Sequence, residues 1–500
     1  MKLSYFEEPE LQFGDGLHLD NKFGLLNLGP FDIHEKRRPE KILIGLVGSP
    51  QSNTGVRDWF KRIGNGVAAK TSKKPNLFPR YPSDADGMPF RSELVFDLAL
   101  QVDLHTRDYV PVSAKPEGIE RLQALAGVFI DKAKDLQNKG ANIVVIAIPG
   151  EAFPLFGQAS EDDDAADEEE ATPVATPVDG VIAPVPVAEE KKKPRVPYFH
   201  DVLKACAMQE GVVIQMIRPS TYDDSMKRKE TDSYGRRRRL QDPATRAWNI
   251  VTGIYYKAGG TPWRIPRKDH DLDTCYLGVS FFKTVDEKTL QTSVAQVFNE
   301  RGYGLIVRGG EATFNKDDRQ VHLDEKGMEE LVSRALNAYS GEHHHLPARL
   351  MVHKSSQFSP SEIKGVKAAV AKASIGFTDM ISLRSSFTRL FRDGYYPPLR
   401  GTCLELNDQE WILYTRGTVY FYEEYPGMYV PKSLMVRFDD ISSSKEEICR
   451  SLLLLSKMNW NNTQMDEVFP ITLRAAHQVG TILKHVPEDG RIEPHYKFYM

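Results

Sequence analysis

The chain has 500 residues, with a hydrophobic fraction of 41% and a charged fraction of 27%, which indicates a globular protein of two or three domains. No run approaches the roughly 18 apolar residues of a membrane span, and the first residues lack the apolar core of a signal peptide. The cysteines show no paired spacing, which predicts reduced thiols in a cytoplasmic protein without a zinc site or disulfide framework: Cys206, Cys275, Cys403 and Cys449.

The formal net charge of −4 conceals a strong imbalance along the chain. Residues 161–190 contain eleven carboxylates and no lysine or arginine, so the rest of the chain carries a formal charge of +7. A mildly basic body is compatible with a polyanionic partner, although charge alone does not establish one.

The first 40 residues are rich in turns and end in Lys36-Arg37-Arg38, and we expect an irregular extension packed on the first domain. Residues 41–48 form a short apolar run that is typical of a buried strand. Ser52 is the expected N-cap of the helix that follows.

Strands and helices alternate through the first half of the chain, which predicts a parallel sheet covered by helices on both faces. In this class of fold, ligands bind where the strand order reverses. The predicted strands after the first are 94–98, 142–149 and 211–217, and the predicted helices are 116–139 and 198–209.

Residues 157–195 interrupt this pattern. The segment is acidic at first, then rich in Pro, Val, Ala and Thr, and ends in three lysines. It cannot bury enough apolar surface to fold, so we expect a disordered acidic insertion. A second interpretation stays open, in which the acidic segment competes with nucleic acid for a basic groove.

A second domain is predicted to begin after Trp263. Its expected order is early strands, a helix, a return strand and late helices, which fits an RNase H-like α/β layout. The predicted strands are 274–282, 305–310, 348–353 and 377–383, with a meander at 402–406, 411–414 and 418–422. The predicted helices are 324–340, 359–372 (with a capped start at Ser359), 445–458 and 471–485.

The two halves meet at Tyr-Tyr-Lys-Ala-Gly-Gly-Thr-Pro-Trp-Arg-Ile, residues 255–265. The glycine pair allows a close backbone approach, and the proline ends the helix that carries Lys257. A glycine pair alone is usually no more than a helix end. The whole string resembles the junction between the MID and PIWI domains of Argonaute proteins, in which the lysine binds the 5′-phosphate of a guide strand.

Three further residues match the resemblance. In Argonautes the MID pocket is formed by Tyr-x-x-x-Lys, a glutamine about a dozen residues later, and the lysine before the glycine pair. Here His200, Lys204, Gln215 and Lys257 occupy these positions. Histidine in place of tyrosine weakens stacking on the first guide base and adds a phosphate donor. Gly253 stands where many relatives have another lysine.

Two more sites are implied. Four consecutive arginines provide either a solvated loop or a strip of contacts to the nucleic-acid backbone: Arg236, Arg237, Arg238 and Arg239. In the family, the C-terminal carboxylate helps to hold a Mg²⁺ that bridges guide phosphates. The resemblance therefore implies Met500 and Gln215 as metal ligands, with the aromatic residues before Met500 docked by burial.

An RNase H-type nuclease needs carboxylates that hold two metal ions. The resemblance places the first carboxylate at Ser280 and another at Ser355, and neither serine can anchor a divalent ion. His477 matches the last position of the family's tetrad. We therefore expect no catalysis by this chain.

The resemblance covers essentially the whole chain and is strongest to short prokaryotic Argonautes, with an extension (1–40), a MID domain (41–258) and a PIWI domain (259–500). It implies that a guide RNA recognises single-stranded DNA of an invader or plasmid in prokaryotic immunity. Signalling would pass to a heterodimeric partner with an APAZ domain fused to a sirtuin-like or TIR module. That partner hydrolyses NAD, and the NAD depletion causes abortive infection. Two alternatives stay open: a guide-directed nuclease with atypical carboxylates, and a regulator that only binds nucleic acid.

Overall fold

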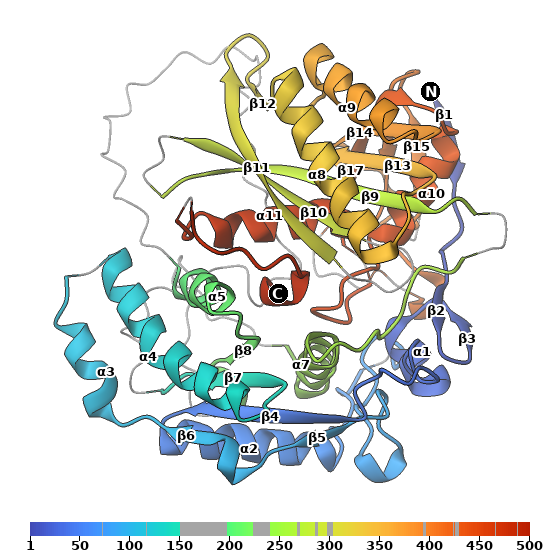
Figure 1. Ribbon diagram of the computed structural model, residues 1–500. Helices are drawn as coiled ribbons and strands as arrows, with labels where there is room; N and C mark the ends of the chain where they lie inside the picture. Colours follow the sequence, from blue (N-terminus) through green and yellow to red (C-terminus); the bar gives the residue numbers. More distant parts are fainter. Residues whose placement is uncertain are drawn as a thin grey trace, which may run out of the picture.

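The computed structural model describes residues 1–72, 74–116, 118–150, 198–223, 241–267, 271–285, 289–297, 304–393, 397–423, 425, 430–465, 467–487 and 489–500. The two large sheets lie in separate halves of the molecule, with α5, α7 and the C-terminus between them (Figure 1). The expected mixed α/β fold is confirmed. Among the described helices, none is long and apolar enough to cross a membrane.

The smaller sheet has the strand order β5-β4-β7-β8, all parallel, and β6 pairs with the far end of β4. Residues of β4 alternate between two hydrophobic clusters, one containing Leu46 and the other Val47, so helices cover both faces as predicted. The strands are β4 (Lys41–Gly48), β5 (Glu93–Val95), β6 (Gln101–Asp103), β7 (Ile143–Ala147) and β8 (Ile214–Ile217). The helices are α2 (Pro50–Gly64), α3 (Thr106–Ser113), α4 (Ile119–Asn138), α5 (Phe199–Gln209), α6 (Pro219–Tyr222) and α7 (Pro243–Lys257).

The larger sheet has the order β1-β15-β16-β17-β14-β13-β9-β10-β11-β12. Its centre is RNase H-like, because β9, β10 and β11 are antiparallel while β13 runs parallel to β9 and β14. The strands are β1 (Lys2–Tyr5), β9 (Thr274–Lys283), β10 (Leu290–Val297), β11 (Gly304–Asn315), β12 (Gln320–His322), β13 (Arg349–Lys354), β14 (Phe377–Ser386), β15 (Thr402–Glu405), β16 (Glu410–Leu413) and β17 (Ser433–Ile441).

Helices cover both faces of this sheet (Figure 1). Leu277 of β9 packs in one cluster with α8 and α9, while its neighbour Tyr276 packs in another with α10 and α11. The α9 start at Ser359 has the expected capping box with Glu362. The helices are α8 (Glu325–His343), α9 (Pro360–Lys372), α10 (Lys445–Leu455) and α11 (Ile471–Leu483), with one-turn 3₁₀ helices η5 (Tyr420–Tyr422) and η6 (Tyr496–Phe498).

Two local predictions were wrong. The third strand of the meander, 418–422, is largely the 3₁₀ turn η5, and β17 takes the place beside β16. Val419 and Tyr422 are three residues apart, which places both on one side of a 3₁₀ turn, where they pack with Met465. The N-cap of α2 is Ser49 rather than Ser52, because Pro50 occupies the first helical position.

The N-terminal segment contacts both halves of the molecule and contains the short elements β1, β2 (Leu11–Phe13), β3 (Gly16–His18) and α1 (Asn21–Leu28). β1 pairs with β15 and so extends the larger sheet, whereas we expected the segment to pack on the first domain. Asp32 does contact that domain, since its carboxylate accepts a hydrogen bond from the Tyr255 hydroxyl of α7 at 2.5 Å.

The junction after α7 explains its glycine pair. Gly259 has φ = 97°, a left-handed conformation that favours glycine. A Cβ at Gly260 would lie 2.3 Å from the ring of Tyr255, which is fully buried. Asp32 also accepts the Thr261 amide at 2.8 Å, so the turn is held from the N-terminal segment.

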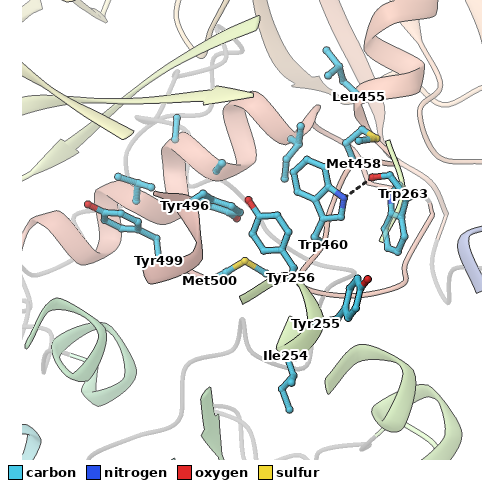
Figure 2. Close-up of a cluster of buried hydrophobic side chains, with 14 of the residues drawn as sticks. Ile254, Tyr255, Tyr256, Trp263, Leu455, Met458, Trp460, Tyr496, Tyr499 and Met500 are labelled. Atoms are coloured by element: carbon cyan, nitrogen blue, oxygen red, sulfur yellow. Dashed lines mark hydrogen bonds between the residues drawn. The ribbon is translucent and has the colours of Figure 1, made fainter. Parts of the chain in front are cut away.

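Two tryptophans join this turn to the C-terminal half of the chain. Trp263 donates from its indole nitrogen to the Lys457 carbonyl at 3.2 Å, and Trp460 donates to the Trp263 carbonyl at 3.0 Å. Trp460 also stacks on Tyr256, with ring centroids 5.1 Å apart (Figure 2). The junction is therefore packed between both halves of the molecule.

Gly260→Ala should lower the free energy of unfolding by about 1–3 kcal/mol, because the new methyl group overlaps a buried ring that cannot move freely. Thermal or urea unfolding measures this change. Gly127→Ala in α4 is the matched control, since a Cβ there meets no atom within 4 Å. It should raise the free energy of unfolding by about 0.5–1 kcal/mol. Equal effects of the two substitutions would contradict the steric explanation.

Candidate functional site

Three of the four residues predicted for the pocket come together between the two halves. Lys204 of α5 is 1% exposed and Lys257 at the end of α7 is 2% exposed. Lys257 donates from Nζ to Gln215 Oε1 on β8 at 2.6 Å, and Lys204 donates to the Ile214 carbonyl at 2.9 Å. The two ammonium groups also interact directly. Helix, strand and helix thus direct their polar groups to one small volume.

Burial of this lysine pair perturbs its protonation. The pKa of Lys257 lies well below its usual value, first because burial penalises the charged form and then because of the neighbouring Lys204. The charge that acts on the Lys257 pKa comes from Lys204 and not from a carboxylate. Two buried lysines that act on each other favour the binding of an anion, which supplies negative charge and several acceptor oxygens.

His200, the fourth predicted residue, lies one helical turn before Lys204 on α5. Its Nδ1 atom is 3.2 Å from the Asp201 carboxylate, and its ring is 6.1 Å from that of Tyr198. Among the described residues, the hydrogen bond and the ring contact of His200 are with these two neighbours and not with the lysine pair.

Sequence reasoning missed Asn461 at this site. A Cβ built on Gly253 would lie 3.7 Å from Asn461 Oδ1 and 3.9 Å from Gln215 Oε1, so the three residues are neighbours. The loop that carries Asn461 is fixed to α7, because Thr463 donates from its amide to Asn249 Oδ1 at 3.0 Å. Asn461 is about 200 residues away from Lys257 in the sequence, and no local sequence pattern indicates that the two are close in the fold.

The C-terminal residues also reach this region. η6 contacts α5, α7 and β11, and Met500 is 2% exposed beside Tyr256 (Figure 2). The expected burial of the aromatic residues before Met500 is confirmed for Tyr496, Phe498 and Tyr499. The proposed role of the Met500 carboxylate stays a prediction.

The protein residues alone do not fit a magnesium ion at this place. Gln215 Oε1 is the oxygen that the prediction assigns to the metal, but it already accepts a hydrogen bond from Lys257. Two adjacent ammonium groups also repel a divalent cation. A Mg²⁺ ion there would depend on oxygen ligands from a bound phosphate, so its presence stays a prediction.

The predicted arginine strip, Arg236, Arg237, Arg238 and Arg239, lies outside the described residues, and so does the acidic insertion at 157–195.

The positions matched to a nuclease tetrad lie on the larger sheet. Ser280 is in β9 and Ser355 directly follows β13, where its amide donates to the Val279 carbonyl at 3.3 Å. The parallel register of β9 and β13 therefore brings the two serines to neighbouring positions. His477 is on α11, which packs across β9. Among the described residues, no group of three or more His, Cys, Asp or Glu side chains could hold a metal ion.

A buried ion pair lies beside these positions. The Lys354 ammonium, fully buried, is 2.9 Å from the carboxylate of Glu362, which His322 also contacts at 3.0 Å. Lys354 donates in addition to the Gln357 carbonyl at 2.8 Å. The charge of Lys354 at the end of β13 is thus compensated by Glu362.

Residues 187–487 match the Piwi domain family, and this match covers more than half of the chain. No protein with a curated function matches the sequence.

Three solved structures share the fold. The structure of Clostridium butyricum Argonaute bound to a guide DNA and a 19-mer target DNA has a TM-score of 0.61 and 16% identity, and the alignment covers 100% of this chain and 55% of that one. Marinitoga piezophila Argonaute with a 5′-OH guide RNA gives 0.54 and 12%, covering 100% and 59%. Drosophila Piwi gives 0.58 and 12%, covering 99% and 56%. The chain thus spans somewhat more than half the length of these proteins.

Proposed function

The chain belongs to the Piwi domain family, and from that premise we propose that it is a short Argonaute that binds a 5′-phosphorylated guide RNA and thereby recognises single-stranded DNA. The buried pair of Lys204 and Lys257 beside Gln215 is the observation that carries this proposal. The Argonautes of similar fold were solved with guide DNA, target DNA or guide RNA, which is consistent with it.

A terminal phosphate suits this pocket better than an internal phosphodiester does. A phosphomonoester carries about −1.5 to −2 charges at pH 7 and three acceptor oxygens. Lys204 and Lys257 would each donate one charge-assisted hydrogen bond, and the Gln215 amide would fix the orientation of the phosphate. The arrangement therefore anchors one end of a guide and leaves its bases for pairing with a target.

We also propose that the chain does not cleave its target. Ser280 and Ser355 stand side by side where the resemblance expects two carboxylates, and a serine hydroxyl is a poor ligand for Mg²⁺. Target recognition would then act through an APAZ-domain partner with a sirtuin-like or TIR module that hydrolyses NAD in the cytoplasm.

The test of this function uses purified protein, a 5′-phosphorylated guide RNA, a complementary single-stranded DNA, and Mg²⁺ or Mn²⁺. We expect the labelled DNA to be retained only with its matching guide and to remain intact on a denaturing gel. A non-complementary DNA is the control. Guide-dependent cleavage at one fixed position would overturn the inactivity and favour the nuclease alternative. Equal retention of both DNAs would overturn guided recognition.

The partner is tested separately by purification from the native host. We expect an APAZ-domain chain to copurify and the complex to consume NAD only when guide and target are both present. Recovery of this chain without another protein would favour the regulator that only binds nucleic acid.

A further inference from the structure

The loop after β14 exposes two aromatic side chains to solvent, where they contribute little to the stability of the fold. Phe387 is 87% exposed and Phe391 is 75% exposed, and both lie in the eight residues that follow Leu383. Isolated exposed apolar residues are common, but exposed aromatic rings grouped on one surface indicate a binding site.

This loop is rigidly held despite its exposure. The hydroxyl of the buried Tyr414 accepts a hydrogen bond from the Leu390 amide at 2.6 Å and donates to the Thr388 carbonyl at 3.2 Å. Ser433 of β17 donates to the same carbonyl at 3.0 Å. The backbone that carries the two phenylalanines is therefore bonded to the sheet at Thr388 and Leu390.

Two tyrosines extend the same surface. Tyr420 is 69% exposed and Tyr5 of β1, which pairs with Thr402 of β15, is 44% exposed. The charges that act on the Tyr5 pKa come from Glu8 and Glu7 as well as from Tyr420 and Arg392. The Pro397 carbonyl ties the two segments together, because it accepts from Arg392 Nε at 3.3 Å and from Thr418 Oγ1 at 3.1 Å.

Two arginines supply positive charge on this surface. Arg389 donates to the Ser386 carbonyl at 2.7 Å, and Arg392 donates to the Pro397 carbonyl. Both guanidinium groups bond to neutral carbonyls, and within the part of the chain that the structure describes, neither arginine forms a salt bridge.

Exposed aromatic rings interleaved with arginines are the combination that binds unpaired nucleic acid, since bases stack on the rings while phosphates meet the cations. We propose that the aromatic platform, defined as Phe387, Phe391, Tyr420, Tyr5, Arg389 and Arg392, binds a single-stranded segment of nucleic acid through base stacking. The platform deepens the proposed function by adding a contact for unpaired nucleotides. Its Tyr5 belongs to β1, which lies far from β4 and β7 (Figure 1).

A fluorescent oligothymidine with a 5′-hydroxyl end tests this proposal, because it cannot use the phosphate pocket. We expect Phe387→Ala/Phe391→Ala to weaken its binding by about tenfold or more, since two stacking surfaces are lost. Phe377→Ala is the matched control: Phe377 is 46% exposed at the opposite end of the same strand, and its loss should leave affinity unchanged. Thermal unfolding verifies that all variants are folded.

A second probe separates stacking from charge. An oligonucleotide of equal length with abasic sites keeps the phosphates but lacks bases. The wild-type protein should therefore bind this abasic probe as weakly as the double variant binds oligothymidine. Arg389→Gln/Arg392→Gln should instead reduce the slope of log affinity against log salt by about 1.4.

Three results would overturn the proposal. The first is that the double variant binds oligothymidine as tightly as the wild type does. The second is that Phe377→Ala loses as much affinity for oligothymidine as the double variant does, and the third is that the double variant loses as much affinity for the abasic probe as for oligothymidine. Unchanged oligonucleotide binding would assign the exposed rings to a protein partner instead. The phosphate pocket is measured independently with 5′-phosphorylated guides, so failure of the platform and failure of the proposed function can be distinguished.

Discussion

Lys204→Ala and Lys257→Ala should each weaken binding of a 5′-phosphorylated guide by at least about tenfold. Each substitution removes one charge-assisted hydrogen bond to the phosphate, which contributes very roughly 1.5–3 kcal/mol. Binding of a 5′-hydroxyl guide of the same sequence should change much less. Fluorescence anisotropy with both guides measures the two affinities for each variant.

Burial of the lysine stems requires a second pair of variants. Lys257→Met keeps the volume of the buried chain and removes the charge, so it should lose phosphate-dependent affinity as Lys257→Ala does. Lys134→Ala is the control for a lysine on the protein surface, where Lys134 pairs with Glu210. If the 5′-hydroxyl and 5′-phosphate guides lose affinity equally in the Lys257 variants, the pocket assignment is wrong.

Glu8→Gln should lower the free energy of unfolding by about 3–5 kcal/mol, because it leaves two buried cations without their anion. Glu8 Oε2 is 2.8 Å from Arg400 Nε and Glu8 Oε1 is 2.9 Å from Lys457 Nζ, and both cationic side chains are fully buried. Urea unfolding measures the change. Glu7→Gln is the matched control, since Glu7 is exposed, and its effect should stay within about 0.5 kcal/mol.

The same ion group predicts a pH dependence. Burial raises the pKa of Glu8, but the Arg400 and Lys457 charges outweigh it and hold the pKa below its usual value. A carboxylate with a lowered folded-state pKa contributes stability above its unfolded-state pKa and loses it as pH falls through the folded-state pKa. The stability difference between wild type and Glu8→Gln should therefore shrink in acid. A difference that stays constant down to strongly acidic pH would contradict the ion-pair account.

Much of the fold was predictable because buried strands and capped helices have recognisable local sequence patterns. The apolar runs at 41–48 and 142–149 are continuous, as strands covered on both faces require, and they form β4 and β7. The serine and the glutamate at the start of α9 predict a capping box, and the structure contains it. The turn at η5 was misread because residues 418–422 are apolar and aromatic enough to resemble a strand.

Long-range pairing was not predictable in the same way. β1 and β15 are separated by about 400 residues, and the four residues of β1 contain no signal that selects this partner. The resemblance to Argonautes allowed the sequence analysis to group Lys204, Gln215 and Lys257. The structure places these three residues next to one another. Asn461 and Glu8 act through tertiary contacts alone, so only the structure reveals them.

The central claim is that the buried lysine pair reads the terminal phosphate of a guide. The most direct measurement compares the affinity of the wild-type protein for two guides of identical sequence, one with a 5′-phosphate and one with a 5′-hydroxyl. We predict at least about tenfold tighter binding of the phosphorylated guide, because only it can meet both Lys204 and Lys257. Equal affinities for the two guides would contradict the claim.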